Sequence, residues 1–259
     1  MTKFLDGRKI ADKIAEKLKK QIKKLKNKKL NLAIILAGKN PKSIIYIDEK
    51  IERAKKLCIN IVLVKFSEKA TKFEIVNKIK ELNQNKNITG IIVQLPLPQK
   101  FDTNKILKTI SPKKDVDGLN WPKNSKFIPP TPRAVLTLLD AYNIEWSGKN
   151  IVLIGKGKLV GLPLELMLRK KGTDPVVCDS KTEDIKECAK SADILISATG
   201  IDNLAKKDWI KKGAVVIDCA EDVNREIEEL TSYITPKIGG IGPLTVIFLF
   251  ENLILATGS

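Results

Sequence analysis

The stretch IVLIGKGKLVG, residues 151–161, decides the fold of this chain. Its first four residues predict a short buried strand, and Gly155, Gly157 and Gly161 follow where a helical pattern begins. Glycines in such a turn let the backbone approach a pyrophosphate, and the helix N-terminus favours its negative charge. The stretch therefore predicts a dinucleotide-binding turn. Its G-x-G-x-x-x-G spacing is one residue longer than the usual fingerprint, so an ordinary glycine-rich turn stays open as the alternative.

An acidic residue stands at the end of the next predicted strand, PVVCDS at 175–180. Asp179 follows Gly155 by 24 residues, close to the roughly 20 that separate the turn from a ribose-binding acid. A carboxylate there disfavours a 2′-phosphate, whereas the nearby Lys156, Lys158 and Lys181 attract one. NAD and NADP therefore both stay open, and a strand-end turn residue is the alternative.

Short apolar runs alternate with helical patterns on both sides of this turn, which predicts parallel sheets covered by helices. The predicted strands lie at 32–38, 60–66, 90–98, 150–157, 175–180, 192–200 and 213–220, and the predicted helices at 8–26, 42–57, 72–84, 131–143 and from about 160. Residues 111–132 are rich in Pro, Asn, Asp and Lys and predict a loop at a domain boundary. The chain ends in a glycine-rich turn and an apolar helix.

Composition limits the chemistry that the chain can perform. It has 259 residues and no histidine, so a common general base and metal ligand is missing, and its four cysteines form no CxxC pair. We therefore expect no metal site, and small buried cysteines. The net charge of +17 suits a nucleic-acid binder, but lysine is spread over the whole chain. With no apolar run of about 20 residues and no export signal, we expect a cytoplasmic protein with no membrane partner.

Four polar residues in the first half form a candidate site. Tyr46 and Lys50 are four apart and share one face of a predicted helix. In a cleft at the strand ends, a desolvated lysine would have a lowered pKa and could transfer protons, although such pairs usually lie on the surface. Gln94 ends the apolar run IIVQL and needs a hydrogen-bond partner, which a strand-end lysine would provide. Asp117 either receives hydrogen bonds from a heterocycle or simply forms an Asp-Gly turn.

Several ordered motifs resemble the bifunctional methylenetetrahydrofolate dehydrogenase/methenyltetrahydrofolate cyclohydrolase family over nearly the whole chain. The motifs are S-x-x-Y-x-x-x-K at 43–50, VQLPLP at 93–98, KDVDG at 114–118, TP at 131–132, VGLP at 160–163, DSKT at 179–182 and GGIGPLTV at 239–246.

This resemblance implies oxidation of 5,10-methylenetetrahydrofolate with NAD(P) and hydrolysis of the product to 10-formyltetrahydrofolate, in one-carbon metabolism and purine biosynthesis. Lys50 is the implied catalytic lysine, Gln94 its hydrogen-bonded partner, Tyr46 the ring that stacks on the folate, and Asp117 the pterin anchor. The implied substrate contacts also include Val93, Leu95, Gly239, Gly240, Ile241, Gly242 and Pro243. The implied cofactor contacts are Gly155, Lys156, Gly157, Val160, Gly161, Pro163, Asp179, Ser180 and Glu221.

The family architecture implies a folate-binding domain over 1–132, completed by a C-terminal helix over 243–259, and a Rossmann-like cofactor domain over 133–242, usually in a homodimer. Some residues depart from the family pattern. Gly155-Lys156-Gly157 replaces a common Gly-Arg-Ser, Asp179 replaces a histidine, and Ala220-Glu221-Asp222 adds two acids near the cofactor. NADP is the cofactor implied by resemblance, and NAD fits the departures. A cyclohydrolase with an inactive cofactor turn and a basic nucleic-acid-binding protein are the alternatives.

Overall fold

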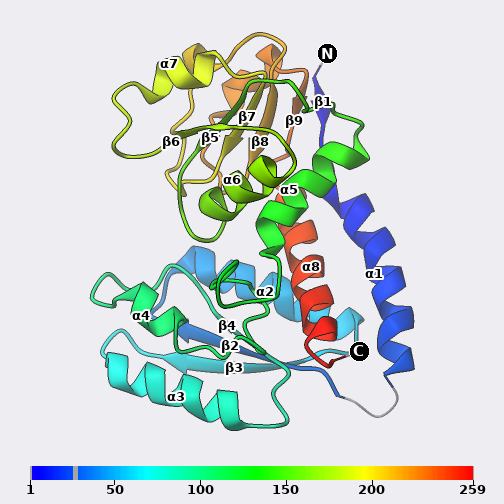
Figure 1. Ribbon diagram of the computed structural model, residues 1–259, viewed down its shortest axis with the longest axis vertical. Coiled ribbons are helices and arrows are strands. Elements are labelled where there is room, and N and C mark those ends of the chain that lie inside the picture. The colour runs from blue at the N-terminus through cyan, green and yellow to red at the C-terminus, as the bar shows by residue number, and fades with distance from the viewer. Residues whose placement is uncertain (1, 26–28, 259) are drawn as a thin grey trace. The chain divides into compact units, whose positions relative to one another are not determined.

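The structure is a computed structural model that describes residues 2–25 and 29–258. The chain forms two compact units, each built from two stretches of sequence. The three-stranded unit comprises Ile14–Pro129 and Val246–Ser259, and the six-stranded unit comprises Met1–Lys13 and Pro130–Thr245. Helices α1 (Gly7–Lys24) and α8 (Ile241–Leu255) each begin in the six-stranded unit and end in the other (Figure 1). The predicted α/β fold with a returning C-terminal helix is confirmed.

The three-stranded unit contains a parallel sheet in the order β3-β2-β4. Alternate residues of the central strand, including Ala33 and Ile35, pack with Ile75 and Ile79 of α3, so this helix covers one face of the sheet. A capping box at Thr71 starts that helix. The elements of this unit are β2 (Asn31–Ala37), α2 (Pro41–Lys56), β3 (Asn60–Phe66), α3 (Lys72–Gln84), β4 (Gly90–Val93) and α4 (Thr103–Leu107).

The six-stranded unit contains a parallel sheet in the order β1-β9-β8-β7-β5-β6. Strand β5 lies between β6 and β7, so the strand order reverses there, and open α/β sheets bind ligands beyond the carboxyl ends of strands at such a point. Its elements are β1 (Lys3–Phe4), α5 (Pro130–Ala141), β5 (Ile151–Ile154), α6 (Gly161–Lys170), β6 (Val176–Cys178), α7 (Ile185–Lys190), β7 (Ile194–Ser197), η1 (Lys207–Trp209), β8 (Val215–Asp218), η2 (Arg225–Leu230) and β9 (Tyr233–Ile234).

The start of the chain differs from the expected domain division of 1–132 and 133–242. Strand β1 pairs in parallel with β9, with Lys3 opposite Tyr233, and the hydroxyl of Thr2 donates to the carbonyl of Thr231 at 3.0 Å. These contacts place the first thirteen residues in the six-stranded unit. Strands of two residues leave no periodicity in the sequence, so nothing indicated β1 or β9.

The burial of the cysteines and the length of the apolar helices bear on two further expectations. The expectation of buried cysteines is confirmed for Cys178 and wrong for Cys58, which is exposed and has a left-handed backbone φ of 56°, while Cys188 and Cys219 are half-buried. Among residues 2–25 and 29–258, no helix is both long enough and apolar enough to cross a membrane.

Candidate active site

Helix α2 carries Tyr46 and Lys50 on one face. The helix begins after Asn40, whose side chain accepts a hydrogen bond from the Ser43 backbone N–H at 3.0 Å, and Pro41 occupies its first turn. The Lys50 ammonium lies 6.0 Å from the centroid of the Tyr46 ring, and 37% of Tyr46 is exposed. A partly exposed aromatic ring therefore lies beside the amine, as the four-residue spacing predicts.

Gln94 follows β4 and bonds to Lys50. Its side-chain Oε1 accepts a hydrogen bond from Lys50 Nζ at 3.0 Å, and its Nε2 donates to the Leu95 carbonyl at 2.9 Å. The second bond turns the amide so that its oxygen faces the lysine. The backbone N–H of Gln94 donates to Ile35 O at 2.9 Å, which extends the sheet pairing by one residue. A rigid strand end thus holds the amine in place.

Burial and the neighbouring carboxylates have opposite effects on the pKa of Lys50. Burial lowers the pKa of the Lys50 ammonium, while the carboxylates of Asp117 and Glu49 act to raise it. Burial also raises the pKa of Asp117, and the positive charge of Lys50 acts to lower it. Loss of hydration is the larger effect for both groups. Lys50 therefore releases its proton more readily than an exposed lysine, as proton transfer near neutral pH requires.

The loop that carries Asp117 is held by residues for which the sequence analysis assigned no role. Asp115 is fully buried and accepts hydrogen bonds from the backbone N–H groups of Leu119 and Asn120 at 3.1 and 2.9 Å. Burial raises the pKa of Asp115 to about 6, against the effect of these bonds. Asn252 on α8 donates to the carbonyls of Val116 at 2.8 Å and Ile128 at 2.9 Å. The last helix of the chain therefore fixes the backbone on both sides of Asp117.

Two other predicted substrate residues belong to the same unit. Val93 is buried within the core cluster of the sheet, whereas Leu95 is partly exposed and packs against that cluster. At 1% exposed, Val93 presents almost no surface to a ligand, so the expectation that it contacts the substrate finds no support here.

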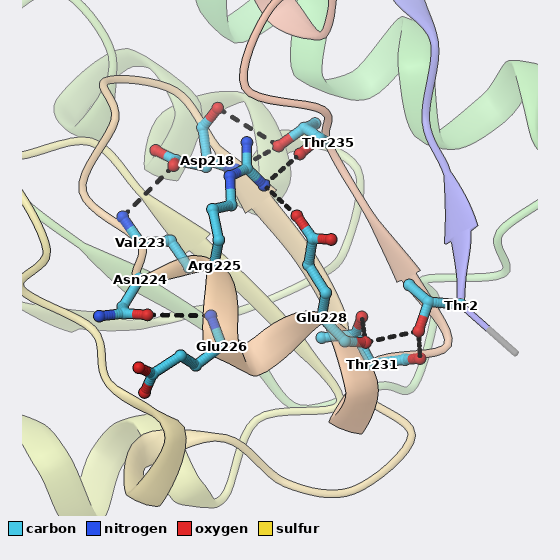
Figure 2. Close-up of polar contacts among 9 residues, drawn as sticks. All are labelled: Thr2, Asp218, Val223, Asn224, Arg225, Glu226, Glu228, Thr231 and Thr235. Carbon is cyan, nitrogen blue, oxygen red and sulfur yellow. Dashed lines mark hydrogen bonds and ion pairs between the residues drawn. The ribbon is translucent and has the colours of Figure 1, made fainter.

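The predicted substrate turn Gly239–Pro243 belongs to the six-stranded unit, where the chain packs too tightly for side chains. A Cβ on Gly7 would lie 2.0 Å from the carbonyl oxygen of Gly240, and Gly239 has a φ of +97°. Figure 2 shows how the strand before this turn is held: the Asp218 N–H donates to the Thr235 hydroxyl at 2.8 Å, and Arg225 donates to the Thr235 carbonyl at 2.9 Å. The turn is therefore firmly positioned.

The glycine turn after β5 fits a dinucleotide pyrophosphate. Gly155 has a φ of +102°, and a Cβ on Gly161 would lie 1.8 Å from the Gly155 carbonyl oxygen. A Cβ on Gly157 would meet no atom within 4 Å, so open space lies above the turn. This cradle leads into α6, whose N-terminal N–H groups can face an anion. Of the other predicted cofactor residues, Pro163 is buried, Val160 is partly buried and Ser180 is exposed.

The two acids after β8 have different positions. Glu221 is exposed and has a φ of 64°. Asp222 is fully buried, and its carboxylate accepts hydrogen bonds from the Ser197 hydroxyl at 2.7 Å and from the N–H groups of Thr199 and Gly200 at 2.6 and 2.7 Å. From the sequence, Asp222 was expected only to add negative charge near the cofactor. The structure assigns it to holding the loop after β7, beside the glycine turn.

Comparisons with known proteins cover both units. Residues 5–117 match the tetrahydrofolate dehydrogenase/cyclohydrolase catalytic domain, and residues 129–258 match the NAD(P)-binding domain of the same family. The bifunctional protein FolD of Thermodesulfovibrio yellowstonii is 39% identical, over 98% of this chain and 96% of that protein. The bifunctional protein FolD of Mesoplasma florum is 40% identical, over 96% and 94%.

Solved structures agree with these matches. The bifunctional FolD enzyme of Campylobacter jejuni has a TM-score of 0.88 at 34% identity and covers 100% of this chain and 99% of its own. The Trypanosoma brucei methylenetetrahydrofolate dehydrogenase-cyclohydrolase, solved with NADP and an inhibitor, has a TM-score of 0.89 at 29% identity, with coverages of 99% and 97%.

Proposed function

Because the chain belongs to the tetrahydrofolate dehydrogenase/cyclohydrolase family, we propose that Lys50 performs the proton transfers of the hydrolysis. The protein is an enzyme that oxidises 5,10-methylenetetrahydrofolate with NAD(P) and hydrolyses the 5,10-methenyl product to 10-formyltetrahydrofolate. The bound dinucleotide supplies the acceptor for the hydride that leaves the methylene carbon. The residues of the chain supply binding, orientation and proton transfer.

One observation carries the assignment of Lys50: its ammonium donates to Gln94 at 3.0 Å while burial lowers its pKa. In hydrolysis, water adds to the cationic methenyl carbon, the adding water loses a proton, and one carbon–nitrogen bond of the ring breaks to leave the formyl group. The neutral amine of Lys50 accepts the proton of the water, and the ammonium can return a proton to the departing nitrogen. Gln94 keeps the amine directed at the reacting carbon.

Two further residues bind the pterin in this proposal. The Tyr46 ring is partly exposed beside Lys50, so a flat heterocycle stacked on it lies within reach of the amine. Asp117 offers carboxylate oxygens to the amino group and ring N–H of the pterin, and the positive charge of Lys50 partly offsets the rise that burial causes in the pKa of Asp117. Leu95 and the Gly239–Pro243 turn are the other folate contacts that we propose.

We assign proton transfer and pterin binding by Lys50, Tyr46 and Asp117 to the three-stranded unit, and dinucleotide binding to the six-stranded unit. In the latter, the proposed contacts are Gly155, Lys156, Gly157, Val160, Gly161, Pro163, Asp179, Ser180 and Glu221. The glycine cradle of 155–161 supports this assignment because only glycine fits at Gly161.

Assembly, compartment and pathway are proposals as well. We propose a homodimer, supported by the edge strand β3 and by Phe73, which is 73% exposed on α3. Light scattering at several protein concentrations tests it, and a mass of one chain throughout would contradict it. We also propose that the enzyme is cytoplasmic and that its formyl product serves purine biosynthesis, as the resemblance implies.

The experiment that tests the site compares Lys50→Met with Lys56→Met, a matched change at an exposed position of the same helix. Both activities are followed spectrophotometrically, with methylenetetrahydrofolate and each dinucleotide, and with methenyltetrahydrofolate alone. We expect Lys50→Met to lose at least about a hundredfold of the cyclohydrolase rate, the usual contribution of a general base. Lys56→Met keeps both rates. Unchanged hydrolysis in a folded Lys50→Met protein contradicts the proposal.

A further inference from the structure

We propose that this enzyme prefers NAD to NADP, and that Asp179 is the residue that excludes the 2′-phosphate. The inference rests on the dehydrogenase activity stated above and concerns the choice between its two possible cofactors. Three observations carry it: the position of Asp179 beside the glycine turn, the fixed orientation of its carboxylate, and the ion pair that occupies Lys156.

Asp179 lies directly beside the glycine turn. Strands β5 and β6 are parallel neighbours in which Ile154 faces Cys178, and the Gly155 N–H donates to the Cys178 carbonyl at 2.8 Å. Asp179 is the next residue, at the carboxyl end of β6. In dinucleotide-binding folds, an acid at the end of this strand accepts hydrogen bonds from the ribose 2′-hydroxyl, which NADP replaces with a phosphate.

The Asp179 side chain is fixed by its own turn. Oδ1 accepts a hydrogen bond from the Lys181 N–H at 2.9 Å, and the Asp179 N–H donates to the Thr182 hydroxyl at 3.0 Å. In the part of the chain that the structure describes, Oδ2 accepts no hydrogen bond, so this oxygen can face a ribose hydroxyl. A phosphate in the same place would meet a carboxylate that cannot rotate away without breaking the turn. Like charges at such a contact disfavour binding.

Lys156, the cation of the glycine turn, is already paired. Its Nζ lies 3.6 Å from Oε2 of Glu165, a buried residue of α6. This Oε2 has no hydrogen-bond partner among the described residues, and Arg169 pairs with the other oxygen at 3.3 Å. Since an uncompensated buried carboxylate is costly, the positive charge of Lys156 stabilises Glu165 and is not free to bind another anion. A 2′-phosphate would have to compete with Glu165 for it.

The remaining turn residues offer a phosphate little. Gly157 has no side chain that could donate a hydrogen bond. Lys158 and Lys181 are exposed, so their attraction for a phosphate is weakened by water and salt, and holding either side chain in one position costs conformational entropy. The fixed carboxylate therefore outweighs these mobile cations.

The test measures direct binding of NAD and NADP to the full-length protein by calorimetry, without folate, at about 0.15 M salt. The variants are Asp179→Asn, which removes the charge and keeps the size, and Glu183→Gln, which makes the same charge change at an exposed position four residues away. We expect wild type to bind NAD at least about tenfold more tightly than NADP, and Asp179→Asn to reduce this ratio by about tenfold, because one like-charge contact is removed. Glu183→Gln should leave the ratio unchanged.

Tighter binding of NADP by the wild-type protein, or an unchanged ratio in Asp179→Asn, would overturn the inference while leaving the proposed function intact. Equal shifts in both acidic variants would show that only net charge matters, and would overturn it too. Absence of saturable binding by either dinucleotide would instead overturn the dehydrogenase activity itself, and the inference with it.

Discussion

Replacement of Asn252 by alanine should loosen the loop that carries Asp117. Asn252 is 2% exposed and donates to two carbonyls, those of Val116 and Ile128, at 2.8 and 2.9 Å. The bond to Val116 is buried, and leaving a buried carbonyl without its donor costs about 1–3 kcal/mol, so the substitution should lower the free energy of unfolding by at least about that amount. The Asp117 anchor then becomes less ordered.

Urea unfolding followed by circular dichroism measures the change in stability, and steady-state hydrolysis of methenyltetrahydrofolate measures the functional effect. We expect the KM for the folate to rise more than kcat falls, because binding is disturbed while Lys50 and Gln94 keep their contact. Asn77→Ala on the exposed face of α3 is the control and should change stability by less than about 0.5 kcal/mol.

Asn252→Asp sharpens the test, because it places carboxylate oxygens against two carbonyl oxygens without changing the volume of the side chain. It should destabilise at least as much as Asn252→Ala at neutral pH. A loss below about 1 kcal/mol in both variants would refute the idea that α8 holds this loop, since the orphaned buried carbonyl of Val116 alone costs at least that much.

Three other predictions follow from the sites described. The Lys50 ammonium should titrate below its ordinary pKa of 10.5. Asp117→Asn should lower the pKa of Lys50 further, because the Asp117 carboxylate acts to raise it. NMR titration of Lys50 in the ligand-free wild type and in the variant measures the two pKa values. Burial raises the pKa of Asp115 from its ordinary 3.8 to about 6 in the folded state, so the stability it contributes at low pH is lost as the pH rises through 6. Unfolding between pH 4 and pH 8 should show wild type losing about 2–3 kcal/mol relative to Asp115→Asn, and parallel curves would contradict this. Gly161→Ala places a Cβ 1.8 Å from a carbonyl oxygen, so this variant should lose dinucleotide binding while it still hydrolyses methenyltetrahydrofolate. In Gly157→Ala the added Cβ meets no atom within 4 Å, so this variant should bind the dinucleotide normally. Calorimetry with the dinucleotide distinguishes the two variants.

Local patterns in the sequence indicated the parts of the structure that depend on neighbouring residues. The glycines at 155 and 161 follow an apolar run, and their close approach is a property of one strand-to-helix turn. The four-residue spacing of Tyr46 and Lys50 fixes a shared helix face. The lone polar Gln94 at the end of an apolar strand required a partner, and Lys50 donates to it.

Other features depend on contacts between distant segments, which periodicity does not reveal. Asn252 reaches carbonyls more than a hundred residues earlier, and nothing near it in the chain signals a bond. Asp222 was interpreted by its charge, but three donors from the end of β7 surround it. The pairing of β1 with β9 joins both ends of the six-stranded unit through only two residues.

The interleaving of the two units has a consequence for biosynthesis. Residues 14–129 and 246–258 form one unit, and Gly90 packs directly against Leu253. A ribosome that has synthesised residues 14–129 has therefore not yet synthesised the helix that closes their core, and the nascent chain completes that core only when residues 246–255 emerge. A stop codon ahead of α8 would leave a core begun at residue 14 without its cover.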